Sequence, residues 1–164
     1  MQMLAIDRHS PYLEAVTALY ERSFPENERR PIQDLMSHFG SAHEMLIFLH
    51  EGCFAGFVSL LTLGDLTHIL YLAIEENFRS QGLGSEALSL IRAYKPSARL
   101  IADLEDTDPS LPDNALRLRR MDFYRRGGYC ESDVRYRWQG ENYVIFINGG
   151  TLTAEEHTAF WQHF

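Results

Sequence analysis

The chain has 164 residues, of which 45% are hydrophobic and 23% are charged, and its formal net charge is −8. This composition is typical of a globular protein with a single domain over residues 1–164, and the acidic balance disfavours a broad basic face for nucleic acid. No apolar run reaches the roughly 18 residues that a membrane-spanning helix needs, so no membrane segment is predicted.

The N-terminal part of the chain alternates between helix and strand patterns. A strand is expected near residues 3–6, followed by a helix with Ser10 as its N-cap and Pro11 as its first residue. A second short helix begins at Pro31. Three strand patterns follow, and the hairpin-like turn Glu51-Gly52 joins the first two. These strands are expected at residues 45–50, 54–63 and 67–74.

The third of these strands leads into a glycine turn that opens a helix. The turn reads Arg79-Ser80-Gln81-Gly82-Leu83-Gly84, and the helix covers about Leu83–Tyr94. The first N–H groups of a helix have no partner in the chain and carry partial positive charge, so such a turn suits phosphate. Arg79 adds a forked cation. A P-loop is excluded because no Gly-Lys-Ser/Thr triplet occurs, and a dinucleotide fingerprint is excluded because Ala87 replaces its third glycine.

The next strand, at residues 99–104, completes a strand–helix–strand unit whose strands are expected to be parallel. After an acidic loop at residues 106–113, a helix covers about Asn114–Arg126 and ends at Gly127-Gly128. The remaining expected elements are a closing hairpin and a capped tail helix, at residues 129–138, 143–148 and after Thr153.

The cysteines and histidines indicate neither a disulfide framework nor a metal site. Cys53 and Cys130 are too few for such a framework, and the N-terminus lacks a signal-peptide pattern, which together favour a reducing cytoplasm. Both thiols are expected to be small apolar groups, buried in or near strands. The 7 histidines form no His-x-x-x-His pair, and none lies beside a cysteine at ligand spacing.

Two stretches resemble signatures of the Gcn5-related N-acetyltransferase (GNAT) superfamily. The turn matches the pattern Gln/Arg-x-x-Gly-x-Gly/Ala after a strand end that here reads Leu72-Ala73-Ile74, and Phe123-Tyr124-Arg125-Arg126-Gly127-Gly128-Tyr129 resembles the end of the family's fourth helix. The order of elements agrees along the whole chain. The resemblance implies an α/β (α+β) fold with a mixed, mostly antiparallel seven-strand sheet, a central splayed parallel pair and about four flanking helices.

The resemblance also implies acetyl-coenzyme A as co-substrate, lying where the two parallel strands separate. Its pantetheine arm would pair with the strand end, and its pyrophosphate would bind the N–H groups of the turn beside the arginine. Tyr124 would protonate the departing thiolate. The implied cofactor-binding residues are Leu72, Ala73, Ile74, Arg79, Ser80, Gln81, Gly82, Leu83, Gly84 and Ser85.

A group that deprotonates the acceptor amine is also required, because an alkylamine has a pKa near the value of about 10.4 of lysine. Glu105 is one candidate and Glu28, in the loop after the first helix, is another; a solvated loop carboxylate is the alternative for each. Arg117 and Arg120 replace the Asn and Ala of the family pattern. The arginines of this helix are expected either to contact coenzyme phosphates or an acidic acceptor, or to form a solvated helix face partly paired with the acidic loop; they are Arg117, Arg119, Arg120, Arg125 and Arg126.

The leading hypothesis is an N-acetyltransferase that acts on a primary amine of a small molecule or peptide by direct attack. The alternative is a non-catalytic acyl-coenzyme A-binding or sensing module of the same fold, which would need no proton handling. The apolar tail at residues 151–164 either packs on its own sheet or contacts a partner chain, for example in a homodimer.

Overall fold

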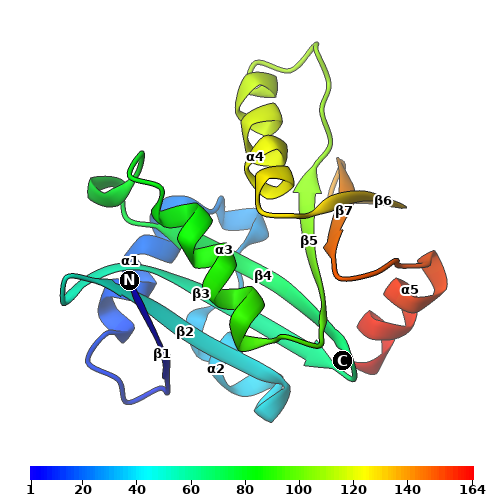
Figure 1. Ribbon diagram of the computed structural model, residues 1–164. Coiled ribbons are helices and arrows are strands. Elements are labelled where there is room, and N and C mark those ends of the chain that lie inside the picture. Colours follow the sequence, from blue (N-terminus) through cyan, green and yellow to red (C-terminus); the bar gives the residue numbers. More distant parts are fainter. The chain divides into compact units, whose positions relative to one another are not determined.

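The computed structural model describes residues 1–164, and its seven strands form one mixed sheet in the order β1-β2-β3-β4-β5-β7-β6 (Figure 1). Only β4 and β5 are a parallel pair, with α3 as their connection, so the expected fold class is confirmed. The strands are β1 (Gln2–Ile6), β2 (His43–His50), β3 (Cys53–Leu63), β4 (Leu66–Ile74), β5 (Arg99–Glu105), β6 (Cys130–Trp138) and β7 (Glu141–Asn148).

Five α-helices accompany the sheet, which is the number that the sequence pattern predicts with the capped tail helix included; the resemblance implied about four. Short 3-10 turns lie at Glu26–Glu28, Gly40–Ala42 and Glu76–Phe78. The α-helices are α1 (Leu13–Ser23), α2 (Ile32–His38), α3 (Leu83–Tyr94), α4 (Asn114–Arg126) and α5 (Ala154–His163). None of these helices has the length and apolarity that crossing a membrane requires.

The chain divides into two compact units. The first unit contains Met1–Thr62 and Ile69–Tyr94, and the second contains Leu63–His68 and Lys95–Phe164. Each unit contributes strands and helices with buried apolar residues. The single domain and the splay of the parallel pair stay predictions.

In the first unit, β1, β2 and β3 are antiparallel neighbours, and a bulge interrupts the β2–β3 register between Phe48 and Leu49. The helix α1 begins at Leu13 and not at Pro11, so the expected N-cap is wrong. The Ser10 hydroxyl instead accepts the Tyr12 N–H at 3.1 Å, which closes the preceding turn.

In the second unit, β7 pairs antiparallel with both β5 and β6. The predicted capping box of α5 is present, since Thr153 and Glu156 exchange side chain–backbone hydrogen bonds of 3.1 Å. Phe160 of α5 is 2% exposed, and its ring contacts His68 of β4 edge-on at 6.0 Å. The tail therefore packs within its own unit.

The two cysteines differ from expectation in one respect. Cys53 and Cys130 do lie in strands and are unpaired, but both side chains are exposed. Each is the first residue of its strand, directly after a turn, where burial by neighbouring strands has not begun. The expectation of buried thiols is therefore wrong.

Candidate functional site

The glycine turn of the first unit is open to solvent. Ser80 and Gly82 have φ values of 63° and 76°, so the backbone reverses twice before α3 begins at Leu83. The first helical hydrogen bond runs from the Glu86 N–H to the Gly82 carbonyl at 3.1 Å. The N–H groups between these residues have no helical acceptor. No atom lies within 4 Å of where a Cβ of Gly82 would be, so the turn has room for an anionic group.

Arg79 is held at the end of β4. Its Nε donates to the Ile74 carbonyl at 3.1 Å, which fixes the guanidinium beside the strand end and the turn. Arg79 also lines a cavity of about 380 Å³, together with Arg22 and Glu75. Those two residues neutralise each other through two hydrogen bonds of 2.9 and 2.8 Å. Because Glu75 pairs with Arg22, Glu75 does not neutralise the positive charge of Arg79.

The strand end at Leu72-Ala73-Ile74 is closely backed by β3. A Cβ on Gly56 would lie 2.3 Å from the Ala73 carbonyl oxygen, so only glycine fits there. The Glu75 N–H donates to the Ala55 carbonyl at 2.7 Å directly after the strand. Gly56 is thus a residue that the sequence analysis missed, although a lone glycine within an apolar strand pattern is a recognised signal of close backbone approach.

Glu28 lies in the loop after α1, which two tyrosines anchor. The Tyr71 hydroxyl donates to the Glu28 carbonyl at 2.7 Å, and the Tyr20 hydroxyl donates to the Arg30 carbonyl at 2.9 Å. The two rings meet edge-on at 4.8 Å. Burial is the main cause that raises the pKa of both tyrosines. Their hydroxyls therefore stay neutral while they anchor the loop. Both hydroxyls thus bind backbone carbonyl groups of this loop.

Tyr124 of the second unit is a buried residue of α4. It is 7% exposed, and its ring contacts Tyr129 edge-on at 5.3 Å. Burial raises the pKa of Tyr124 to about 12; Asp103 acts in the same direction and Arg120 opposes them. The hydroxyl is therefore protonated at neutral pH and can donate a hydrogen bond.

Glu105 is bound by arginines of α4. Its Oε2 lies 2.8 Å from Nη2 of Arg117, and its Oε1 lies 3.4 Å from Nη1 of Arg120. Both carboxylate oxygens are thus engaged in ion pairs. This geometry favours a structural role, and the assignment of Glu105 as a base stays a prediction.

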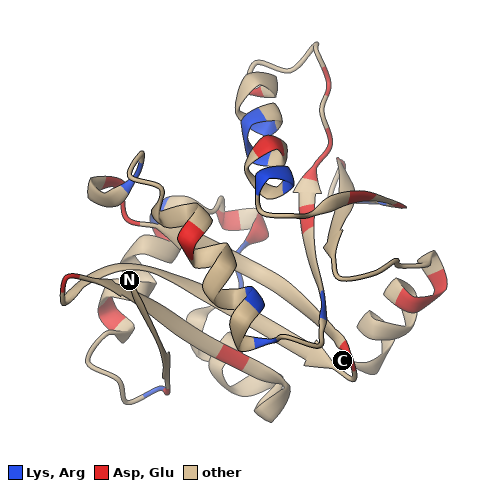
Figure 2. Cartoon of the chain, viewed as in Figure 1, with Lys and Arg blue, Asp and Glu red and all other residues tan.

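Arg117 is the centre of a larger ion-pair network in the second unit. Besides Glu105, it binds Glu141 at 2.7 Å and Asp113 at 3.2 Å, and it donates to the Asp106 carbonyl at 3.0 Å. The side chain is 6% exposed, so the expected solvation is wrong for Arg117, whereas the expected pairing with the acidic loop is present. Figure 2 shows the basic residues along α4. Arg120, whose side chain is 43% exposed, does face solvent in part.

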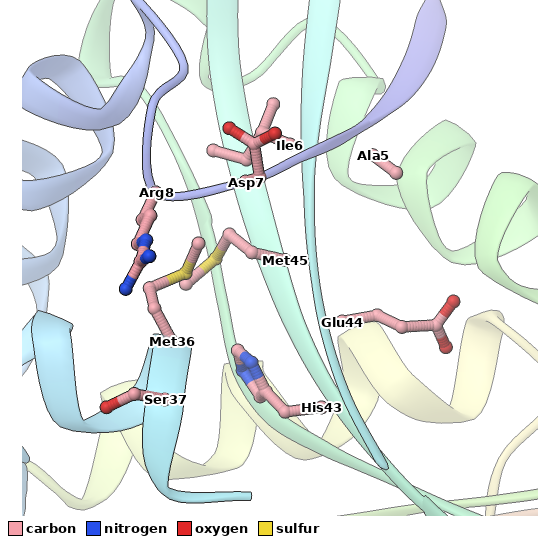
Figure 3. A pocket seen from close by; sticks show the side chains of 9 residues that line it. All are labelled: Ala5, Ile6, Asp7, Arg8, Met36, Ser37, His43, Glu44 and Met45. Atoms are coloured by element: carbon pink, nitrogen blue, oxygen red, sulfur yellow. The ribbon is translucent and has the colours of Figure 1, made fainter. Parts of the chain in front are cut away.

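Another cavity of the first unit, about 440 Å³ in volume, contains none of the predicted site residues (Figure 3). Its lining includes Arg8, Met36 and His43. The Nε2 of His43 lies 2.6 Å from the Ser59 hydroxyl, and burial lowers the pKa of His43 to about 4. In the whole structure, no group of three or more His, Cys, Asp or Glu residues could hold a metal ion.

The sheet is mixed, with one parallel pair joined through a helix that begins at an exposed glycine turn, and this architecture is a GNAT-like α/β fold. The model of the acetyltransferase (GNAT) family matches residues 13–129. The chain therefore belongs to the GNAT family. Among curated proteins, no sequence matches it.

Solved structures share the fold at low sequence identity. A Bacteroides thetaiotaomicron protein assigned to the GNAT acetyltransferases is 17% identical, with a TM-score of 0.80 over 99% of this chain and 94% of that one. The aminoglycoside 6'-N-acetyltransferase of Enterococcus faecium is 13% identical, with a TM-score of 0.67 over 90% and 96%. The ribosomal-protein-S18-alanine N-acetyltransferase of Escherichia coli is 16% identical, with a TM-score of 0.67 over 94% and 97%. At identities this low, the TM-scores show a common fold and nothing beyond it.

Proposed function

We propose that the protein is an acetyl-coenzyme A-dependent N-acetyltransferase that acetylates a primary amine of a small molecule or peptide by direct attack. The observation that carries this proposal is the exposed turn at the start of α3, with its free N–H groups and the guanidinium of Arg79. Among the similar structures, an aminoglycoside 6'-N-acetyltransferase is complexed with coenzyme A, and a GNAT acetyltransferase from Elizabethkingia anophelis has acetyl-CoA bound.

The cofactor is assigned to the residues of the first unit. The N–H groups from Ser80 to Ser85 would bind the pyrophosphate, and Arg79 would contribute its charge. The backbone at Leu72-Ala73-Ile74 would pair with the pantetheine arm as an added strand does. A local device of this kind is required because the chain as a whole carries a net charge of −8.

The transfer step is assigned to one backbone group and one side chain. The amine nitrogen attacks the thioester carbonyl carbon while a backbone N–H near Leu72 stabilises the negative charge that develops on the oxygen. The carbon–sulfur bond then breaks, and the protonated hydroxyl of Tyr124 gives its proton to the leaving sulfur. The nitrogen loses one proton as it becomes an amide, and the tyrosinate regains one from solvent, so the products are the N-acetylated amine and the free thiol. Burial raises the pKa of Tyr124, which keeps the hydroxyl protonated but makes it a weaker acid, so the proton would pass only as thiolate charge develops on the leaving sulfur.

The acceptor is assigned only by class. Similar structures include an aminoglycoside 6'-N-acetyltransferase and a ribosomal-protein-S18-alanine N-acetyltransferase, so the same fold serves small-molecule and peptide amines. An acidic protein attracts a cationic amine, which agrees with either class. A cytoplasmic location and a homodimer stay predictions.

The second candidate function is acyl-coenzyme A binding without catalysis. It is favoured by Glu105, whose two carboxylate oxygens are engaged by Arg117 and Arg120 and are poorly placed to take a proton. A thiol-release assay with a panel of alkylamines, arylamines and peptides separates the two. Acetyl-coenzyme A turnover with at least one amine supports the transferase, whereas saturable cofactor binding without turnover across the panel supports the binding module.

A further inference from the structure

The cavity of about 440 Å³ in the first unit lies where β1 and β2 separate (Figure 3). The last paired residue of β1 is Ile6, opposite Met45, whereas β2 already begins at His43. Beyond Ile6 the chain turns away, and the Ser10 N–H donates to the Asp7 carbonyl at 3.1 Å. The C-terminal part of α2 also lines the cavity. The cavity therefore arises because one of two paired strands ends before the other.

Arg8 brings a positive charge to this cavity that is not paired within the chain. The residue is exposed, lines the cavity and forms no ion pair. The two acidic residues of the lining are engaged elsewhere. Oδ1 of Asp7 accepts the His9 N–H at 2.8 Å. The Tyr94 hydroxyl donates a hydrogen bond to Glu44. Figure 3 shows both carboxylates directed away from Arg8. An unpaired guanidinium with forked donors suits the carboxylate of a ligand.

His43 supplies a neutral polar group at the start of β2. Its Nε2 lies 2.6 Å from the Ser59 hydroxyl, so Nδ1 is the ring nitrogen that remains for a ligand. Burial lowers the pKa of His43 to about 4, and the ring is therefore uncharged at neutral pH. When the hydroxyl donates to Nε2, the ring proton lies on Nδ1. The pair can thus offer an N–H group to a carboxylate without adding a second charge.

Two methionines form the apolar part of the cavity. Met36 of α2 is half-buried, and Met45 of β2 is 2% exposed. Figure 3 shows their side chains directed toward each other between Arg8 and His43. Thioether side chains are unbranched and adapt to the shape of an apolar group. Small-molecule sites have volumes of roughly 300–1,000 Å³ and combine apolar walls with a few convergent polar groups, and this cavity has both properties.

We propose that this cavity binds a small organic acid whose carboxylate contacts Arg8 and His43 and whose apolar body lies against the two methionines. The single cation selects a negative charge, and the thioethers select an apolar body of a few carbon atoms. The net charge of −8 repels anions in general, so binding must depend strongly on Arg8. The inference concerns ligand binding alone and does not depend on the proposed transferase function.

The proposed acid site lies away from the cofactor turn along the same sheet. His43 is paired with Leu61 of β3. Gly56 of β3 instead backs the strand end at Ala73, which leads to the turn. Gly56 and Leu61 are five positions apart, and an antiparallel strand rises about 3.4 Å per residue, so the two places are about 17 Å apart along β3. An acid in the cavity and acetyl-coenzyme A at the turn should therefore bind without competing.

Methyl-labelled methionine gives a direct readout, because the chain has 5 methionines and two of them line the cavity. In NMR titration with hexanoate, the methyl signals of Met36 and Met45 should shift saturably, with a Kd of about 0.1–1 mM. The signal of Met121, on α4, should stay unchanged. Acetate lacks the apolar body and hexanol lacks the charge, so each should bind at least about tenfold more weakly. No saturable shift up to about 20 mM hexanoate, or equal affinity for hexanol, would overturn the inference.

Substitution of Arg8 isolates the contribution of the charge. Because Arg8 is exposed and forms no ion pair, Arg8→Gln should keep the fold and weaken hexanoate binding by about tenfold. Arg119→Gln, at an exposed position of α4, is the matched control and should leave the Kd unchanged. An equal Kd in Arg8→Gln and the native chain would contradict the proposed site.

A competition arm separates the acid site from the cofactor turn. Acetyl-coenzyme A at about 1 mM should leave the Kd for hexanoate unchanged. Displacement of hexanoate would place the acid at the turn and refute the inference. Failure of acetyl-coenzyme A to bind at all would instead remove the transferase proposal and leave this inference standing.

Discussion

At the scale of single residues, burial shifts the pKa values of Tyr124 and His43 in opposite directions. Tyr124 is 7% exposed and keeps its proton, because burial raises the pKa of its hydroxyl to about 12. His43 stays neutral, because burial lowers its pKa to about 4. Desolvation disfavours the charged form in both cases, which means the anion for tyrosine and the cation for histidine.

Replacement of Tyr124 by Phe removes the proposed proton donor but keeps the buried ring. We expect kcat to fall by about 10–10²-fold and the Kd for acetyl-coenzyme A to change by less than about twofold. Thiol release and calorimetry measure the two quantities. Tyr94→Phe, at the partly exposed C-terminal end of α3, is the matched control. An unchanged kcat in Tyr124→Phe would refute the role.

The His43 imidazole should make stability depend on pH. Between pH 6.5 and about pH 4, His43 binds a proton in the unfolded chain but not in the folded chain. The free energy of unfolding therefore falls as pH falls through this window. The full loss is on the order of 3 kcal/mol. His43→Gln should flatten this dependence in urea unfolding at about pH 7 and about pH 4.5. His9→Gln, an exposed change, should leave it as it is. Burial also lowers the pKa of His157, so part of the slope should remain in His43→Gln, and an unchanged slope would contradict the account.

At the scale of elements, the arginine network joins α4 to the strands beside it. Arg117→Met leaves the carboxylates of Glu105, Asp113 and Glu141 without their shared partner. Because these carboxylates are partly exposed and rehydrate, we expect a loss of about 1–3 kcal/mol in the free energy of unfolding. Urea unfolding measures it. Arg119→Met, an exposed position on the same helix, should cost less than about 0.5 kcal/mol, and equal effects of the two changes would argue against the network.

The contact between β3 and the end of β4 gives a second prediction at this scale. In Gly56→Ala, the new Cβ would meet the Ala73 carbonyl oxygen, so the backbone must shift. We expect a loss of about 1–3 kcal/mol in the free energy of unfolding and weaker acetyl-coenzyme A binding. Gly140→Ala, where φ is +80° and no atom lies within 4 Å, should cost about 1 kcal/mol and leave binding intact. Unchanged binding in Gly56→Ala would contradict the role of this strand end.

Local signals made many of these elements predictable. The helix α4 has its expected bounds, because an acidic loop and a glycine pair mark its ends, and the capping box of α5 follows from two residues three positions apart. The prediction that Ser10 is the N-cap of α1 is wrong because its hydroxyl closes a turn just before the helix. Ser and Thr hydroxyls accept backbone N–H groups both at helix N-caps and in turns, and the local sequence pattern is the same in the two cases.

Tertiary contacts were beyond the reach of the sequence pattern. Arg117 looks like a surface residue of a basic helix, and its burial arises from Glu105, Asp113 and Glu141, which lie on different segments. Likewise, Nε2 of His68 on β4 lies 3.1 Å from Oδ1 of Asp103 on β5, and these two strands are far apart in the chain. The turn at Arg79–Gly84 was recognisable because its geometry depends on neighbouring residues only.

At the scale of the whole molecule, an acidic chain must bind an anionic cofactor. With a net charge of −8, long-range electrostatics repel coenzyme A, and the short-range contacts at the α3 turn must more than offset this repulsion. Salt screens the long-range repulsion and weakens the attraction by exposed Arg79 as well. Because short-range contacts at the turn must provide the attraction, the affinity for acetyl-coenzyme A tests these contacts rather than the net charge of the chain.

Titration of the protein with acetyl-coenzyme A in a calorimeter is the decisive measurement. We predict saturable binding with one site and a Kd of about 1–100 μM, weakened by about tenfold in Arg79→Gln. A change of that size corresponds to about 1.4 kcal/mol. Absence of saturable heat up to about 1 mM acetyl-coenzyme A would contradict the account.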